Sequence, residues 1–306
     1  MNDLTVILTF FNEGVEVLKT LQCLISMTKK KFDIILINDN SNDEYDYVEI
    51  AETFGAKYIE HVERKGPAVS RDEGVLICTT EYFLLLDAHM RVYQDDWVER
   101  IVNELKKEEK GLLCCSTLAL NKDADLVQNR LVGYGAFISL HDLDTHWITN
   151  LYKDDSRIPC VLGASYACSK KYWMDLNGLK GLKLYGLEEQ LISMKVWLSG
   201  GKCFVLKDVC FGHIFRDELP ASYEITPTEY YLNQLYVVEL LYNIAYKQRF
   251  IRNLRRKMGD KIVNELLEEF KQYREEIAKE KLYYKILFVK TFDFIVEFNT
   301  PSLVCH

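Results

Sequence analysis

Short apolar runs alternate with amphipathic segments along the first part of the chain. Three apolar runs predict β-strands at residues 4–10, 33–38 and 82–86, and residues 56–60 predict a further, shorter strand. Helical spacing of apolar residues lies between them, at 17–25, 47–54 and 66–78. Strands that alternate with helices in this way are typical of βαβ units. We therefore expect an α/β fold with a mostly parallel sheet flanked by helices.

The alternation continues less regularly as far as residue 215. Amphipathic spacing and apolar runs predict helices at 95–110 and 190–198, and strands at 111–120, 159–168 and 202–206. The strand at 159–168 contains the small residues Gly163 and Ser165, where a ligand can approach a backbone closely. Residues 121–155 have mixed polarity that favours neither type of element.

The pattern changes near Pro220, where long helical patterns replace the strand-like runs. They cover residues 228–249, 262–279 and 283–297. We therefore expect an α/β domain at 1–219 and a helical C-terminal extension at 220–306. The aromatic-rich segment at 281–296 fits three environments: packing on the α/β domain, contact with a second copy of the chain, or a membrane surface. The absence of a dense basic face favours packing.

The composition is that of an ordinary soluble globular protein, with 48% hydrophobic and 27% charged residues. A net charge of −8 disfavours a nucleic-acid partner, because no basic excess is available to displace counterions from phosphates. The first ten residues are typical of a strand rather than of a secretory leader, and no apolar run reaches membrane-spanning length. The nine cysteines form no C-x-x-C pair, as expected in a reducing compartment. We expect a cytoplasmic protein, with peripheral contact at the inner face of the membrane as the alternative.

The predicted strand at 82–86 leads directly into Asp87 and His89. Open α/β sheets bind ligands at the carboxyl ends of their strands, so both side chains are expected at the ligand-binding edge. In extended backbone, residues two apart point the same way, and the carboxylate and imidazole can converge on one cation. An oxygen and a nitrogen ligand together suit Mn²⁺ or Zn²⁺. The alternative is a strand that merely ends in polar turn residues.

Several short motifs follow one another between about residues 4 and 217. They are Phe10-Phe11-Asn12-Glu13, Asn38 to Asp43, Arg64 to Gly74, Leu86-Asp87-Ala88-His89, Tyr185-Gly186-Leu187-Glu188-Glu189, Val196 to Gly201, and Gly212-His213-Ile214-Phe215-Arg216. Together they resemble the nucleotide-sugar glycosyltransferases of the A-type, Rossmann-like fold. The similarity is greatest to family 2 and to the polypeptide N-acetylgalactosaminyltransferases, whose L-D-A-H and G-H-V-F-R motifs correspond to two of these stretches.

This resemblance implies a metal ion and a nucleotide-sugar donor at one site. It implies that Asp87, His89 and His213 bind Mn²⁺ or another divalent cation, which neutralises the leaving diphosphate. It assigns binding of the UDP-sugar to a further set: Phe10, Asn12, Glu13, Asp39, Arg71 and Arg216. Within that set the aspartate contacts the uracil, and the two arginines hold phosphate.

Structural alternatives stay open for several of these residues. Arg71 could lie on a solvated helix face, and Asp39 could be an ordinary turn residue. His213 could cap the end of a strand instead of binding a metal. Tyr185 fits a core position or a wall of the acceptor site equally well.

The chain departs from the resembling enzymes at Glu189. The retaining N-acetylgalactosaminyl enzymes have Asn after the Glu of W-G-G-E-N, whereas inverting family-2 enzymes have an acid there and use it as a base. The resemblance therefore favours inversion, with Glu189 as the general base on the acceptor hydroxyl and Glu188 orienting the acceptor. The alternative is that the two acids simply begin a helix, where they suit the helix dipole.

We therefore expect a metal-dependent glycosyltransferase that moves a hexosyl or N-acetylhexosaminyl group from a UDP-sugar to a hydroxyl of a glycan or lipid-linked glycan acceptor, as in capsule or lipopolysaccharide synthesis. One alternative is a retaining N-acetylgalactosaminyl-type transferase that acts on protein. Another is a non-catalytic nucleotide-sugar-binding or assembly protein. The intact set of Asp87, His89 and His213 argues against the last alternative.

Overall fold

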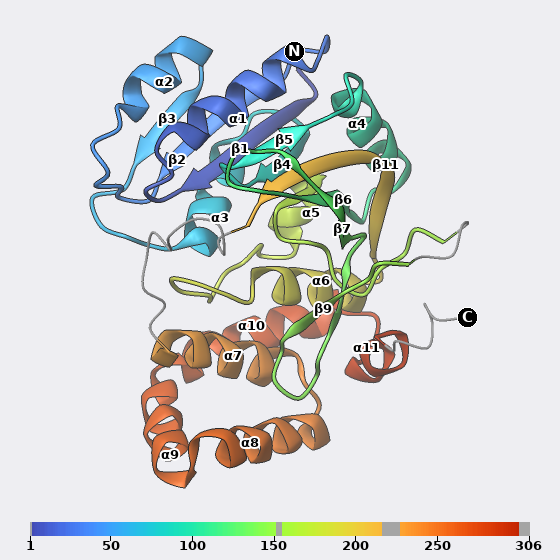
Figure 1. Ribbon diagram of the computed structural model, residues 1–306. Helices are drawn as coiled ribbons and strands as arrows, with labels where there is room; N and C mark the ends of the chain where they lie inside the picture. Colours follow the sequence, from blue (N-terminus) through green and yellow to red (C-terminus); the bar gives the residue numbers. More distant parts are fainter. Residues whose placement is uncertain (1, 151–154, 216–226, 300–306) are drawn as a thin grey trace.

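A mixed β-sheet lies at the centre of the N-terminal part of the computed structural model, which describes residues 2–150, 155–215 and 227–299 (Figure 1). The strands are β1 (Leu4–Phe10), β2 (Asp33–Asn38), β3 (Lys57–Glu60), β4 (Tyr82–Leu86), β5 (Met90–Val92), β6 (Gly111–Leu120), β7 (Leu126–Gly133), β8 (Ala136–Ile138), β9 (Thr145–Trp147), β10 (Ser165–Ser169) and β11 (Lys202–Ile214). Their order in the main sheet is β3-β2-β1-β4-β10-β6-β11-β5, with β7 paired to β6, while β8 and β9 pair separately. Strands β1 to β4 are parallel, whereas β10 runs antiparallel to β4 and β6.

Helices cover both faces of this sheet (Figure 1). In the α/β part they are α1 (Val15–Ser26), α2 (Tyr47–Phe54), α3 (Pro67–Ile77), α4 (Trp97–Lys107), α5 (Lys170–Asp175) and α6 (Glu188–Leu198). Apolar side chains of α1, α2 and α4 pack on one face with Val6 and Leu8, and those of α3, α5 and α6 pack on the other face with Ile7. Because neighbouring strand residues point to opposite faces, the unbroken apolar run of β4 is buried on both sides.

The C-terminal helices pack on the same face as α6. They are α7 (Pro227–Leu241), α8 (Ile244–Met258), α9 (Asp260–Glu269), the 3-10 helix η2 (Phe270–Tyr273), α10 (Arg274–Leu287) and α11 (Phe292–Phe298). Their buried side chains belong to one apolar cluster with those of α3, α5 and α6. The Tyr284 hydroxyl donates to the carbonyl of Leu176 at 2.7 Å, and the ring centroids of Trp197 and Phe298 lie 4.5 Å apart. Among the described helices, none combines the length and apolarity needed to cross a membrane.

The early elements confirm the predictions, and the differences begin later in the chain. Strands β1, β2, β4 and β6 have the predicted ends. The strand predicted at 202–206 is longer, because β11 resumes pairing with β6 after an irregularity between Leu206 and Cys210. His213 therefore lies inside a strand. The unassigned segment 121–155 supplies β7, β8 and β9.

The prediction of a strand at 159–168 was wrong in its first half. The strand begins as β10 only at Ser165. The residues before it form a loop, and the indole Nε1 of Trp197 in α6 donates to the carbonyls of Ile158 and Pro159 at 3.2 and 3.1 Å. These backbone groups are therefore satisfied by a side chain instead of by a neighbouring strand.

The C-terminal helices are shorter and more numerous than the three predicted patterns. Asn243 interrupts the first pattern by capping α8, since its side chain accepts from the backbone N–H of Tyr246 at 3.0 Å. Gly259, with φ 85°, separates α8 from α9. The domain boundary predicted between 219 and 220 lies outside the described residues.

Candidate active site

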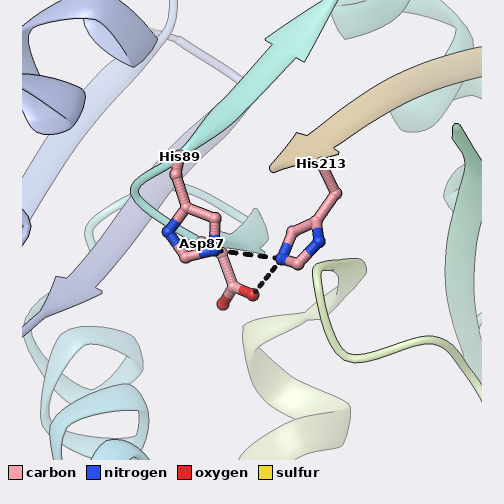
Figure 2. A group of neighbouring side chains, drawn as sticks. All are labelled: Asp87, His89 and His213. Carbon is pink, nitrogen blue, oxygen red and sulfur yellow. Dashed lines mark hydrogen bonds and ion pairs between the residues drawn. The ribbon is translucent and has the colours of Figure 1, made fainter. Parts of the chain in front are cut away.

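Three potential metal ligands meet where β4, β5 and β11 come together (Figure 2). Asp87 follows β4, His89 precedes β5, and His213 lies on β11, which pairs with β5. The Nε2 atoms of the two histidines are 3.0 Å apart, and Nε2 of His213 is 3.4 Å from Oδ2 of Asp87. One ligand atom from each residue lies within 4.8 Å of the other two. The convergence depends on a turn at Ala88 and on strand pairing, and not on the extended Asp-x-His segment expected from the sequence.

The protonation of these groups fits a divalent cation. Burial lowers the pKa of His89 and of His213, which favours the neutral imidazoles that bind metals. Burial opposes ionisation of Asp87, but the hydrogen bond from His213 and the charge of Arg71 together lower its pKa below the usual range. One carboxylate and two facing imidazole nitrogens form a donor set suited to Mn²⁺ or Zn²⁺. The residues present thus fit a divalent metal.

Glu13 orients one of these histidines. Its Oε2 lies 3.0 Å from Nδ1 of His89, and both side chains are buried. A carboxylate that accepts from Nδ1–H leaves the Nε2 lone pair directed at the cluster, an arrangement that often supports metal-binding histidines. Glu13 thus contacts His89 through the ring nitrogen that faces away from the other two potential metal ligands.

Arg71 connects the metal cluster to a second group of acids. It lies on α3 and is only 7% exposed, so the alternative of a solvated helix face was wrong. Its guanidinium contacts Oδ1 of Asp87 at 3.1 Å and Oε1 of Glu189 at 3.3 Å. Burial would lower the pKa of Arg71, but Tyr166, Asp87 and the nearby glutamates raise it well above its usual value. The cation is therefore permanently charged and held between the two groups.

Glu188 and Glu189 begin α6 and line the same pocket as the potential metal ligands. The Glu188 carboxylate is 4% exposed and accepts from the backbone N–H of Gly186 at 3.2 Å. Burial and the adjacent Glu189 raise the pKa of Glu188 to about 7, and Arg71 opposes this shift. Gly163 makes room for the second acid, because a Cβ there would lie 2.4 Å from Oε1 of Glu189. We predicted that Gly163 lets a ligand approach the backbone, and in the structure the Glu189 side chain occupies that space.

Asp39 stands at the end of β2 and binds the loop that leads into α3. It accepts from the backbone N–H groups of Lys65 and Gly66, each at 2.8 Å, and its Oδ1 lies 2.8 Å from Nδ1 of His61. The other ring nitrogen of His61 lies 2.8 Å from the Glu73 carboxylate. Asp39 is therefore buried, holds the loop before α3 through two backbone hydrogen bonds, and also lines the pocket.

Most of the side chains described so far line one pocket of about 310 Å³. Of the predicted donor-binding residues, Phe10, Glu13, Asp39 and Arg71 line it together with the three potential metal ligands and both glutamates. Asn12 does not line it: its side chain and backbone pair with Asn42 and Ser41 and join the first two motif loops. Arg216 lies outside the described residues.

The comparisons with known proteins agree with this geometry. Residues 5–155 match the family model described as Glycosyl transferase family 2. This chain carries a family-2 glycosyltransferase domain. Human polypeptide N-acetylgalactosaminyltransferase 14 is 25% identical over 233 residues, which cover 71% of this chain and 41% of that protein. A putative polypeptide N-acetylgalactosaminyltransferase 13 of Drosophila melanogaster is 25% identical over 239 residues, covering 70% and 42%.

Solved structures place the family-2 domain in the A-type fold. The crystal structure of GalNAc-T7 with UDP, GalNAc and Mn²⁺ has a TM-score of 0.72 at 21% identity, and covers 97% of this chain and 56% of that one. The structure of S. aureus TarS 1–349 in complex with UDP-GlcNAc has a TM-score of 0.54 at 13% identity, and covers 94% and 90%. The chain spans about two fifths of the length of the curated relatives it matches.

Sequence reasoning missed Trp147, which lines the pocket, and two residues that contact pocket residues, His61 and Tyr166. Trp147 on β9 lines the pocket with 48% of its surface exposed, and its ring centroid lies 5.5 Å from that of Phe215. It belongs to the segment whose polarity favoured no element. His61 and Tyr166 contact Asp39 and Arg71 from different elements. A Trp in a polar segment was the one available signal; His61 and Tyr166 carry no local pattern that marks them.

Proposed function

We propose that the family-2 domain transfers a sugar from a UDP-sugar to a hydroxyl group of a glycan or lipid-linked glycan, with a divalent cation such as Mn²⁺. The observation that carries this proposal is the meeting of Asp87, His89 and His213 in the pocket that Asp39 and Arg71 also line. The fold likeness to GalNAc-T7 with UDP, GalNAc and Mn²⁺ and to TarS with UDP-GlcNAc supports it. Under this proposal Asp87, His89 and His213 hold the cation, which supplies positive charge to the leaving diphosphate.

Four side chains of the protein bind the donor, activate the acceptor and orient it. Asp39 recognises the uracil edge, and Arg71 adds a fixed positive charge beside the cation site. Glu189 takes the proton of the acceptor hydroxyl as the acceptor oxygen bonds to the anomeric carbon, while the bond from that carbon to the diphosphate oxygen breaks. Glu188, whose pKa is about 7, retains a proton over part of the neutral range and donates a hydrogen bond that orients the acceptor.

A donor panel tests this function. UDP-, GDP- and dTDP-sugars are incubated with the protein with and without Mn²⁺, and release of the nucleoside diphosphate is measured. We expect metal-dependent turnover of a UDP-sugar. A folded protein that neither binds nor turns over any of these donors would contradict the proposal and favour a non-catalytic assembly protein.

The role of Glu189 has its own test. Glu189→Gln should lower the transfer rate by roughly 10²–10⁴-fold, the usual range for loss of a general base, while donor binding stays within a factor of about two. NMR of the anomeric proton in the first product should show inversion. Retention would instead favour a second candidate, a retaining transferase acting on protein, which the similarity to polypeptide N-acetylgalactosaminyltransferases supports.

A further inference from the structure

The loop before α6 adopts an unusual backbone at the acceptor side of the pocket. Three of its residues have positive φ: Leu184 at 50°, Gly186 at 104° and Leu187 at 79°. Leucine rarely adopts this conformation, because its Cβ then crowds the following carbonyl. Such a backbone persists only where surrounding contacts hold it in place.

Asn233 of α7 supplies those contacts. This side chain is 3% exposed, and its Oδ1 accepts from the backbone N–H of Lys183 at 3.0 Å. Its Nδ2 donates to the carbonyls of Lys183 at 2.8 Å and of Tyr185 and Gly186 at 3.2 Å each. One amide therefore binds the loop through four backbone groups.

The same loop carries groups of the proposed site. Tyr185 lines the pocket, and the N–H of Gly186 donates to the Glu188 carboxylate at 3.2 Å. On its other side, the loop lies against Gly66, where a Cβ would come 2.0 Å from the carbonyl oxygen of Leu184. A shift of the loop would therefore move the carboxylate and the aromatic wall together.

The next residue of α7, Gln234, binds a second segment beside the pocket. Gln234 Nε2 donates to the carbonyl of Asp142 at 2.6 Å, in the turn that joins β8 to β9 and thus leads to Trp147. The ring of Tyr230 covers Gly186, because a Cβ on that glycine would lie 2.7 Å from the ring. Helix α7 thus contacts the two segments that bring Tyr185 and Trp147 to the pocket.

We propose that Asn233 is a positioning residue for the acceptor side of the site, and that α7 is the element through which the C-terminal helices contribute to transfer. Asn233 holds the loop 183–187 in the conformation that sets Tyr185 and Glu188 for the acceptor. The inference rests on the proposed function for its catalytic consequence. Its structural part, that Asn233 restrains the loop, stands independently of activity.

The experiment compares Asn233→Ala and the milder Asn233→Ser with the wild-type chain and with Glu239→Gln. Glu239 lies on the same helix but pairs with Lys247 and Lys281 among the C-terminal helices, so its variant controls for loss of stability there. Two quantities are measured: transfer to an acceptor, and metal-dependent hydrolysis of the UDP-sugar without acceptor. Amide hydrogen exchange of residues 183–187 is followed in parallel.

We expect Asn233→Ala to lower kcat/KM for the acceptor by about 10–100-fold while donor hydrolysis changes less than about twofold, and Asn233→Ser to do so to a smaller extent. The amides of 183–187 should exchange faster in both variants and at the wild-type rate in Glu239→Gln. Equal losses of transfer and hydrolysis, or unchanged transfer, would overturn the catalytic part. Unchanged exchange in the loop would overturn the inference even if the wild-type chain proved to have no transferase activity.

Discussion

At the scale of single residues, the potential metal site depends on one carboxylate more than on any other group. Asp87 contacts both His213 and Arg71, so it connects the two histidines to the cation on α3. A carboxylate is also the donor that balances the positive charge of a divalent metal. Replacing it by an amide keeps the shape of the side chain and removes that charge.

We predict that Asp87→Asn abolishes metal-dependent turnover and weakens Mn²⁺ binding by more than the roughly 10–100-fold loss typical of an outer-shell substitution. Titration of Mn²⁺ by calorimetry measures the affinity without relying on activity. The exposed Asp123 provides the control, and Asp123→Asn should bind Mn²⁺ as the wild type does. Unchanged affinity in Asp87→Asn would show that the cation site lies elsewhere.

Glu188 allows a pH-dependent prediction. Its pKa is raised to about 7 in the folded protein from an ordinary value of 4.5, chiefly by burial. The folded state therefore binds this proton more tightly than the unfolded state, and the resulting stability is complete below pH 4.5 and is lost as the pH rises through about 7. Glu188→Gln resembles the protonated form at every pH.

The free energy of unfolding of Glu188→Gln should therefore rise relative to the wild type as the pH increases from 4.5 to about 7, and the difference should then level off. Urea unfolding at several pH values, without added metal, measures this difference. Glu63→Gln, at an exposed position, serves as the control. Parallel stability curves for Glu188→Gln and the wild type would show that Glu188 is not buried as the structure has it.

At the scale of elements, the loop that binds Asp39 and the loop that precedes α6 meet at one glycine. Gly66 precedes α3 with φ 90°, donates its N–H to Asp39, and lies against the backbone of Leu184. Any side chain there would strain the backbone and separate the two loops. Gly55 offers a comparison, since it has φ 62° and no atom lies within 4 Å of the place that a Cβ would occupy.

We predict that Gly55→Ala lowers the free energy of unfolding by roughly 1–2 kcal/mol, the usual effect of a left-handed alanine. Gly66→Ala should lower it further, because the Cβ would come 2.0 Å from the Leu184 carbonyl oxygen. It should also weaken UDP binding, as the loop that contacts Asp39 is displaced. Chemical denaturation and UDP titration measure both effects. Equal stability losses in the two variants would contradict the close approach of the loops.

At the scale of the whole molecule, the C-terminal helices and the α/β part share one buried apolar cluster. Tyr284 of α10 is 2% exposed, bonds the carbonyl of Leu176, and stacks on Phe288 at 4.6 Å between ring centroids. Its neighbour Tyr283 is 40% exposed. A continuous core of this kind should unfold in one transition rather than in two.

We predict that Tyr284→Ala lowers the free energy of unfolding by roughly 3–5 kcal/mol, as for other large-to-small core substitutions. Tyr283→Ala, which removes one largely exposed hydrogen bond, should lower it by about 1 kcal/mol. Tryptophan fluorescence and far-UV circular dichroism should report a single coincident transition in each variant. Separate transitions would contradict the shared core and show that the C-terminal helices fold independently of the α/β part.

Local signals account for the correct predictions. An apolar run of five residues predicted β4 without error, because a strand buried on both faces needs an apolar residue at every position. The chemistry of Asp87 and His89 was visible for the same reason, since both directly follow that strand. The long helical patterns of the C-terminal part were detected but not divided correctly, because Asn243, which lies inside the first pattern, fits a helix until its backbone conformation is known.

Contacts between distant segments could not be read from such patterns. His89 and His213 are 124 residues apart, and they meet because β11 continues beyond its irregularity to pair with β5. Asn233 reaches the loop 183–187 across about fifty residues, through packing of α7 on the α/β part. The linear order of apolar and polar residues thus established the class of fold and two of the three potential metal ligands, Asp87 and His89, because periodicity and strand ends are local properties. The sequence named His213 only through the resemblance of its motif to a known family, and tertiary pairing is what brings it against His89. Tertiary packing alone decided the partners of Arg71 and the contact of Asn233 with the loop 183–187, because many side chains along the chain could have filled those places and only the folded geometry selects among them.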